Sequence, residues 1–284
     1  MIVSGRKSWE DAVRWLCQQP DQQELVRACY YDQPRIHAAE RFRRSEEWQA
    51  TRAWLPKPPG RALDVGAGHG ISSYALAADG WRTTALEPDP SSFIGAEAIR
   101  RLAIEAAVAI EVVETVGEAL PFQDGEFDLV YGRQVLHHAN ELHRFCRELY
   151  RVTRPGGILV STREHVVSSV RQLERFRSGH PLHHLYGGEN AYRLGEYLAS
   201  LRSAGFNVRT VRPFDSVVNY APFTRDTLRN ELQRRLAIFP GGALVGRALE
   251  SGILFSFALR ILSRVDRRPG RLFSFVAVRP ETTR

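Results

Sequence analysis

A glycine-rich turn offers the clearest chemistry in this chain of 284 residues. The run Leu63–Gly70 reads LDVGAGHG and lies where a short apolar segment gives way to a helical pattern. Glycine lets the backbone turn sharply and approach a ligand closely. The amides at the start of the following helix face the crevice in which open α/β sheets bind ligands. The turn therefore predicts a cofactor site.

The spacing of the glycines separates two cofactor classes. A dinucleotide fingerprint requires G-x-G-x-x-G, and after Gly66 and Gly68 its last glycine would fall on Ile71. The chain has G-x-G-x-G instead. Glu87 closes the next strand, nineteen positions after Gly68, and a carboxylate there can accept both hydroxyls of a ribose. Glu87 supports a nucleoside cofactor without choosing between NAD and S-adenosylmethionine (SAM).

Alternating strands and helices must position these residues at one edge of a sheet. Short apolar runs predict strands at 61–65, 81–86, 109–115, 127–131, 158–162, 206–211 and 272–278. Helical spacing predicts helices at 70–78, 91–103, 141–152 and 190–204. This alternation, with right-handed crossovers, predicts an α/β fold with a doubly wound, mostly parallel sheet and helices on both faces.

Helical segments flank the predicted core on both sides. Residues 8–55 have helical spacing, with one helix expected over 38–54, and prolines with Gly60 separate them from the core. Residues 166–188 combine a helical stretch with a histidine-rich loop. We divide the chain into an N-terminal helical cap (1–58), a cofactor-binding core (59–212), a helical insertion or lid (213–270) and a final strand with the tail (271–284).

Composition narrows the possible partners and the location. The net charge of +7 comes almost entirely from arginine, and the basic residues alternate with acids, as in Arg43, Arg44, Glu46 and Glu47. The chain has no dense basic block, so we expect no nucleic-acid partner. No stretch approaches the ~20 apolar residues of a transmembrane helix, and the N-terminus does not resemble a secretory signal. Three cysteines without a CxxC pair favour a reducing, cytoplasmic location.

Four motifs follow the glycine-rich turn in a fixed order. They are EALPF (118–122), FDLV (127–130), LHH (136–138) and RPGG (154–157). In this order and at these spacings they resemble the type 11 family of small-molecule methyltransferases over about residues 61–163. The resemblance implies the class I, Rossmann-like methyltransferase fold with a seven-stranded sheet. It also implies SAM as methyl donor and S-adenosyl-L-homocysteine as product.

The resemblance further implies a SAM pocket across the ends of the first, second and fourth strands. The amino-acid part of SAM would contact Asp64, and the ribose of SAM would contact Glu87. Val116 departs from the family, which often has an aspartate there facing the adenine; Glu114 or a backbone group would have to replace it. The cofactor-binding residues implied are Asp64, Gly66, Ala67, Gly68, Gly70, Glu87, Pro88, Gly117, Glu118, Ala119, Arg133 and Gln134.

Histidines after the fourth and fifth strands are candidates for catalysis. Methyl transfer is an in-line displacement, in which a protein mainly aligns the reactants and sometimes supplies a base. Histidine suits that role near neutral pH. His165, beside Glu164, is the first candidate and His138 the second, although His138 also fits a helix-capping turn.

A second group of histidines lies in the loop after the fifth strand. His180, His183 and His184 are close in sequence to Glu189, but their spacing matches no recognised ligand set. We therefore predict no metal site, and expect this segment to face the acceptor.

These patterns predict a SAM-dependent methyltransferase acting on an O or N atom of a small-molecule or glycan acceptor, as a monomer or homodimer. Three alternatives stay open: an RNA or protein methyltransferase, which needs a continuous basic groove; a non-catalytic SAM-binding module; and a nicotinamide oxidoreductase, which Ile71 disfavours. The apolar and arginine residues of 213–270 would fit either a helix packed on the core or a partner, or a peripheral membrane contact.

Overall fold

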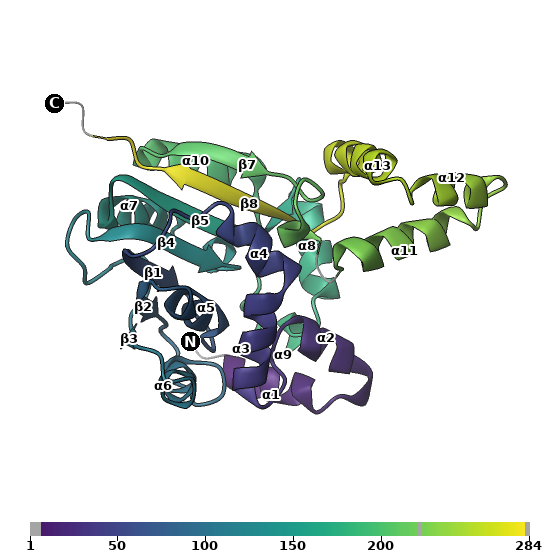
Figure 1. Ribbon diagram of the computed structural model, residues 1–284. Coiled ribbons are helices and arrows are strands. Elements are labelled where there is room, and N and C mark those ends of the chain that lie inside the picture. The colour runs from purple at the N-terminus through teal and green to yellow at the C-terminus, as the bar shows by residue number, and fades with distance from the viewer. Residues whose placement is uncertain (1–6, 221–222, 282–284) are drawn as a thin grey trace.

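The computed structural model describes residues 7–220 and 223–281 and is built around one twisted sheet (Figure 1). Its strands follow the order β3-β2-β1-β4-β5-β8-β7. Strands β1 to β5 run parallel, whereas β8 runs antiparallel to both β5 and β7. The strands are β1 Arg61–Val65, β2 Arg82–Leu86, β3 Ile110–Val113, β4 Phe127–Arg133, β5 Thr153–Val167, β6 Tyr192–Arg193, β7 Asn207–Val211 and β8 Arg271–Val278.

The predicted mostly parallel sheet is confirmed, with one addition. The main path has the seven strands expected from the sequence, and the two-residue strand β6 pairs with the end of β5 as an eighth. Strand β5 is longer than predicted because it continues past the edge of β4 and pairs with β8 as far as Val166. The extra length carries Arg163, Glu164 and His165 beyond the end of β4.

Helices cover both faces of the sheet, as predicted. On one face, α7 (Leu142–Val152) and α10 (Leu194–Ala204) pack together and bury Phe145, Leu149 and Tyr197 against the strands. The other face carries α5 (Ile71–Ala78), α6 (Ala96–Glu105), α3 (Arg35–Arg44) and α4 (Glu46–Arg52). Burial of these apolar faces, at roughly 25 cal/mol per Å², is the main force that holds the layers together.

The single helix expected over 38–54 is wrong, because the chain breaks at Ser45. Ser45 has extended backbone angles, and its hydroxyl accepts the amide hydrogen bond of Trp48 (3.1 Å), which caps α4. The same hydroxyl donates to the carbonyl of Phe42 (2.6 Å). The break lets the Phe42 and Trp48 side chains both lie fully buried, with the Trp48 indole donating to Asp79 (2.9 Å).

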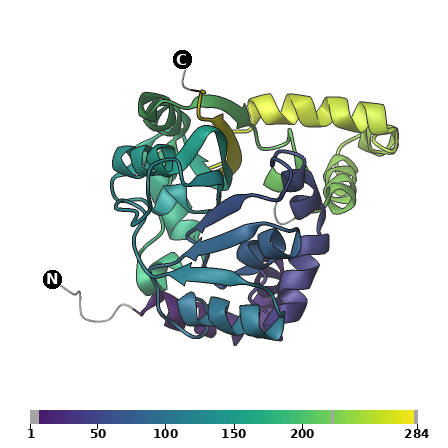
Figure 2. The ribbon, with the colours of Figure 1, turned by 60° about the vertical axis from the view of Figure 1, so that its left-hand side comes forward.

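A cover over the sheet edge combines segments from two parts of the chain. It contains α1 (Trp9–Cys17), the one-turn helix η1 (Pro20–Gln22), α2 (Gln23–Ala28), α8 (Val170–Gly179) and α9 (His183–Tyr186). The rings of Trp9 and Tyr186 lie 4.7 Å apart, and the Lys7 amide donates to the Leu185 carbonyl (3.0 Å). Figures 1 and 2 show this cover beside the carboxyl ends of the strands.

Three helices before the last strand project from the sheet as an arm (Figure 1). They are α11 (Arg225–Leu236), α12 (Gly242–Ala248) and α13 (Gly252–Val265), and they follow the short helix η3 (Val217–Asn219). We call residues 225–268 the arm. The helical insertion predicted for 213–270 is thus present as helices, but no described residue between 213 and 269 lines the main cavity. The arm therefore differs from the lid that we expected.

Candidate active site

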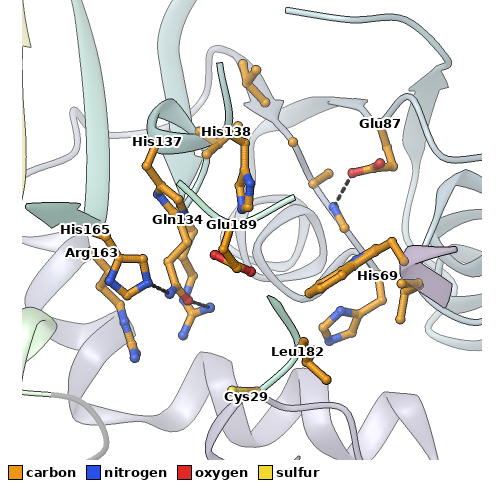
Figure 3. A pocket seen from close by; sticks show the side chains of 18 of the residues that line it. Cys29, His69, Glu87, Gln134, His137, His138, Arg163, His165, Leu182 and Glu189 are labelled. Carbon is orange, nitrogen blue, oxygen red and sulfur yellow. Dashed lines mark hydrogen bonds between the residues drawn. The ribbon is translucent and has the colours of Figure 1, made fainter. Parts of the chain in front are cut away.

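A cavity of about 730 Å³ lies between the carboxyl edge of the sheet and the cover (Figure 3). Its walls come from the turn after β1, the end of β2, the segment after β4, and the cover helices α1 and α2 with the loop around α9. Ligand pockets of proteins span roughly 300–1,000 Å³. The cavity therefore has room for a cofactor and a small second reactant.

The glycine-rich turn has the backbone shape expected from its sequence. Gly66, Gly68 and Gly70 all have positive φ, at 63°, 55° and 88°, a region that glycine enters without steric cost. A Cβ added to Gly66 would lie 2.4 Å from Val135 Cγ2, whereas one added to Gly68 would meet open space. Gly68 thus leaves its backbone accessible to a ligand in the cavity.

Glu87 lies at the end of β2 and faces the same cavity. One carboxylate oxygen accepts the Gly68 amide (2.7 Å) and the other accepts the Asp89 amide (3.0 Å). Burial raises the pKa of Glu87 to about 7, although the hydrogen bonds from these amides oppose that shift. The structure therefore holds the carboxylate beside the turn, where the sequence placed the ribose.

Asp64 lies behind the turn and does not line the cavity. One of its oxygens accepts the hydroxyls of Ser72 (2.7 Å) and Ser73 (2.6 Å), in the first turn of α5. Burial raises its pKa to about 6. Asp64 thus holds the first turn of α5 against β1 through one oxygen, and its direct contact with the cofactor stays a prediction.

The adenine end predicted from the sequence is lined by Val116, Gly117 and Glu118. Phe145 closes the wall behind Gly117, where an added Cβ would lie only 2.1 Å from its ring. Glu118 accepts the Asn140 amide (3.0 Å). Glu114 forms an ion pair with Arg100 (2.6 Å) and does not line the cavity, so it does not replace the aspartate that the family often has at position 116.

Two arginines share one buried carboxylate at the opposite end of the cavity. Arg133, the last residue of β4, pairs with Glu47 of α4 (2.7 Å), and Arg163 of β5 pairs with the same carboxylate. Burial raises the pKa of Glu47, but the two guanidinium groups outweigh it and hold that pKa below its usual range. Together, Glu47 and the two arginines carry one net positive charge.

The Arg163 side chain has an unused donor. Its Nε is buried and has no partner among the described residues, and Arg163 lines the cavity. Gln134 and Arg163 both have positive φ, at 57° and 61°, a strained conformation for side chains of this size. The strain and the free donor together mark this corner as a place for an anionic group, such as the carboxylate of an amino acid.

His165 lines the cavity, but both of its ring nitrogens are engaged. Nδ1 donates to the Gly270 carbonyl (2.9 Å), and Nε2 accepts from the Gln134 amide (3.4 Å) (Figure 3). Burial, with the neighbouring His137, lowers the pKa of His165 to about 3. With both ring nitrogens bonded and a low pKa, His165 is a weak base, so it fits the role of first catalytic candidate less well than its place in the sequence indicates, and that role stays a prediction. Its position suits it to orient Gln134.

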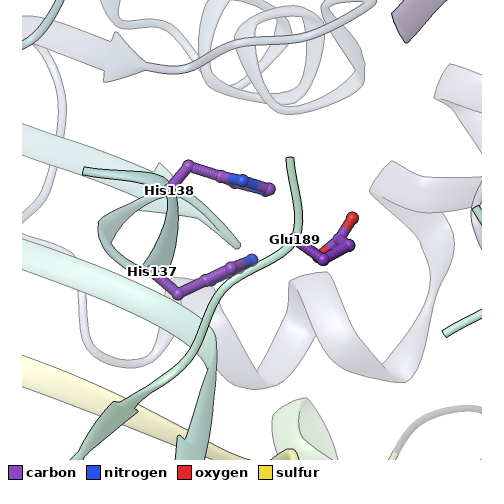
Figure 4. Close-up of side chains that lie close together, drawn as sticks. All are labelled: His137, His138 and Glu189. Carbon is purple, nitrogen blue, oxygen red and sulfur yellow. The ribbon is translucent and has the colours of Figure 1, made fainter. Parts of the chain in front are cut away.

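His137 has a fixed orientation inside the one-turn helix η2 (Leu136–His138). Its Nδ1 donates to the buried Glu164 carboxylate (2.7 Å), which also accepts three backbone amides and the Ser161 hydroxyl (2.6 Å). Burial lowers the pKa of His137 well below its usual value, so the ring is neutral. The other ring nitrogen of His137 is directed toward Glu189 (Figure 4).

His138 lies beside His137 and points into the cavity with Glu189. The two imidazole rings lie 4.2 Å apart, and His137, His138 and Glu189 place polar atoms within 4.8 Å of one another. Burial raises the pKa of Glu189. His180, 3.5 Å away, and His138 lower it by more, so the pKa of Glu189 lies below its usual value. Glu189 is therefore an ionised carboxylate beside an accessible imidazole.

The same three side chains, His137, His138 and Glu189, could also hold a divalent cation. Glu164 would then be the outer partner of His137, an arrangement common around metal-bound histidine. Residue spacing does not reveal this set, because Glu189 joins the two histidines only through the fold. The absence of a metal stays a prediction.

The cavity brings together most of the residues predicted from the sequence. Of these, Gly66, Ala67, Gly68, Glu87, Pro88, Gly117, Glu118, Arg133, Gln134, His138 and His165 line it. Asp64, Gly70 and Ala119 do not. His137 and Arg163 line the cavity, and Glu47 pairs with both arginines, although the sequence did not predict these three roles. Of these, only His137 had a local signal, because it belongs to the LHH motif.

Comparison with known sequences agrees with this geometry. Residues 63–161 match the model of the methyltransferase domain family. The chain is 37% identical over 114 residues to an uncharacterized methyltransferase of Mycobacterium sp. (strain KMS), covering 40% of this chain and 42% of the relative. It is 35% identical over 99 residues to a ubiquinone biosynthesis O-methyltransferase of Methylocella silvestris, covering 35% and 38%. The chain spans about two fifths of these relatives.

Solved structures share the fold. The cyclase SpnF superposes with a TM-score of 0.56 at 21% identity, covering 87% of this chain and 82% of its own. Phosphoethanolamine N-methyltransferase 2 of Haemonchus contortus, solved with SAM, gives 0.54 at 18% identity, covering 95% and 60%. The fold is the Rossmann-like fold of these methyltransferase structures, as predicted, and residues 63–161 are similar to the methyltransferase domain family.

Proposed function

We propose that this protein transfers a methyl group from SAM to an oxygen or nitrogen atom of a small-molecule acceptor. One observation carries the proposal. Glu87 and the open backbone of Gly68 share a single cavity with His138 and Glu189. A nucleoside-binding edge and a proton-accepting pair therefore face the same enclosed space. The relatives named as O- and N-methyltransferases support this reaction class without choosing the atom.

The residues present fit SAM at three positions. The Glu87 carboxylate can accept the two ribose hydroxyls. The free Arg163 Nε, in a corner with one net positive charge, suits the carboxylate of the amino-acid part. The apolar wall of Val116, Gly117 and Phe145 suits a flat adenine ring. When bound, SAM supplies a methyl group on a sulfonium, which is a good leaving group.

The protein's own part in the reaction is to align the reactants and accept a proton. His138 takes the proton from the O–H or N–H of the acceptor, and the ionised Glu189 stabilises the imidazolium that forms. Such a base contributes roughly 10²–10⁴-fold to a rate. His165 and Gln134 position the neighbouring wall. This assignment reverses the order of the two histidines expected from the sequence.

The cover favours a small acceptor over a polymer. Trp9, Leu16, Leu25, Tyr31 and Tyr186 line the cavity from the cover side, so the acceptor needs an apolar or aromatic part to fill this space. Because these side chains close over the carboxyl edge of the sheet, a folded RNA or protein would have to displace them. A single sugar fits within this cavity, whereas a bulkier glycan does not.

The test is methyl transfer from SAM labelled in its methyl group to a panel of phenols, hydroxylated quinones, amines and monosaccharides. We expect label in at least one small acceptor, and loss of that label in a variant that cannot bind SAM. Tight SAM binding without label in any acceptor, RNA or protein would instead favour a non-catalytic SAM-binding module.

The raised pKa of Glu87 predicts how cofactor binding depends on pH. The ribose hydroxyls need an ionised carboxylate, and a carboxyl with a pKa of about 7 becomes protonated as the pH falls. Affinity for S-adenosylhomocysteine should therefore weaken about tenfold from pH 8 to pH 6. Calorimetry over this range checks it. The Glu87→Gln variant should bind weakly with a flatter profile; an equal pH slope in both proteins would contradict the assignment.

The thiols support a reducing location for this activity. Cys17, Cys29 and Cys146 are all free in the structure, and burial raises the pKa of each thiol above its ordinary value. Thiols in this state are not reactive nucleophiles. We propose that the protein works in the reducing cytoplasm and that none of these cysteines takes part in the reaction.

A further inference from the structure

The arm exposes an unusual amount of apolar surface. Most of the large apolar side chains that the described residues leave exposed lie within it: Ile238, Phe239, Leu244, Val245, Ile253, Leu254, Phe257, Ile261 and Val265. Ile253 is 82% exposed and Phe257 60%. Soluble proteins rarely leave such side chains together unless something binds them. The arm is therefore a candidate interaction surface.

These exposed side chains are not needed to fold the arm. Phe255 and Leu259 of α13 already pack with Leu228 and Leu249, and with Tyr220, in a separate buried cluster. Arg225 and Arg229 stack over the Phe255 ring, and Ser263 donates to Asp215 (2.7 Å). One face of α13 is thus buried against the rest of the protein, and the apolar face opposite it takes no part in that packing.

The exposed face of α13 is continuous along the helix. Ile253, Phe257, Ile261 and Val265 recur at every fourth position, so they form one stripe. The buried Phe255, Leu259 and Ser263 form the opposite stripe. A helix with one stripe toward its own protein and a second apolar stripe toward solvent has the pattern of an interfacial helix.

Arginines border this stripe, and their charge indicates which kind of partner binds it. Arg260 and Arg264 lie beside Phe257 and Ile261 on the same side of α13, and Arg247 is exposed on α12. None of the three has an ion pair with any residue that the structure describes. The arm as a whole carries nine arginines against four acidic residues. Apolar side chains bordered by unpaired positive charges match an anionic lipid surface.

The geometry of the arm suits helices that lie on a bilayer surface and does not suit helices that cross the bilayer. Among the described residues no single helix has the length and apolar character of a membrane span, and although α12 and α13 together reach that length, they meet at a bend of 111°. The arginines on α13 would also have to enter the hydrocarbon. We infer that the arm docks the protein on an anionic lipid bilayer through the Ile253–Phe257–Ile261 stripe and its bordering arginines. This inference does not depend on the proposed methyl transfer.

Vesicle co-sedimentation tests the proposal with the full chain. We expect binding to vesicles of phosphatidylcholine with phosphatidylglycerol, and weaker binding to phosphatidylcholine alone or at high salt, because salt screens the arginines. The double variant Ile253→Ser, Phe257→Ser should bind at least about tenfold more weakly. Since both side chains are exposed, the variant should keep its melting temperature. Ile104→Ser is the matched control, because Ile104 is 81% exposed on α6, outside the arm.

Either of two results with the double variant would overturn the proposal. One is equal vesicle binding by the wild type and the double variant, or binding by neither. The other is a wild-type dimer, seen by light scattering, that the double variant converts to a monomer without any vesicle binding; a second copy of the chain would then cover the stripe. Charge reversal of Arg260 and Arg264 to glutamate should abolish the preference for anionic vesicles, and a retained preference would equally count against it.

Discussion

Replacing His138 with asparagine is expected to lower the rate of methyl transfer by about 10²–10³-fold while SAM binding changes less than about twofold. The reason is that His138 is the accessible imidazole beside an ionised Glu189, whereas the variant leaves unchanged the groups proposed to hold SAM, which are Glu87 and Arg163. Single-turnover kinetics with labelled SAM, beside calorimetry with the same variant, separates the two quantities. His143→Asn is the matched control, because His143 is exposed on α7 and does not line the cavity.

The Glu189→Gln variant should slow the reaction as well, and the double variant should be no slower than His138→Asn alone, because a base and the group that orients it act as a unit. A His138→Asn enzyme with unchanged turnover would contradict the assignment. Loss of activity in EDTA, restored by a divalent cation, would also contradict it, since His137, His138 and Glu189 would then hold a metal ion.

Replacing Glu87 with alanine is expected to weaken SAM binding by at least about 100-fold at pH 8, which corresponds to about 3 kcal/mol. Two hydrogen bonds from the ribose to an ionised carboxylate are each worth roughly 1.5–3 kcal/mol. The variant also frees the Gly68 and Asp89 amides, which Glu87 now holds in place. Calorimetric titration measures the effect directly.

The control for Glu87 is Glu97→Ala, which removes the same charge from the exposed surface of α6, where Glu97 pairs with Arg101 (2.9 Å). It should bind SAM like the wild type. Both variants should unfold cooperatively near the wild-type temperature. A Glu87→Ala protein that is folded and binds SAM normally would show that the cofactor lies elsewhere.

The core of the fold was predictable because local patterns determine it. Strand β1 has the predicted bounds, and α10 ends at Gly205, a glycine with φ of 113° that closes the helix as expected. The break at Ser45 was missed although serine is a favoured helix N-cap. A continuous apolar spacing across 38–54 hid it, since the residues on both sides are buried.

The cofactor edge was predictable for the same reason, and the acceptor end was not. Gly68 and Glu87 follow neighbouring parallel strands, so their meeting is a consequence of topology. The Glu47 pair with Arg133 and Arg163, and the approach of Glu189 to His138, join segments that no periodic pattern connects. The place of His165 after a strand end favours it as a catalytic base, and only the structure shows its bonds to Gly270 and Gln134.

Calorimetric titration of the purified protein with SAM, S-adenosylhomocysteine and NAD shows most directly which cofactor the cavity binds. If the cavity is a SAM site, the protein binds SAM and S-adenosylhomocysteine in the micromolar range with one site per chain, Glu87→Ala loses that binding, and NAD produces no heat. Binding of NAD, or no binding of either SAM or S-adenosylhomocysteine by the folded protein, would show that the cavity is not a SAM site.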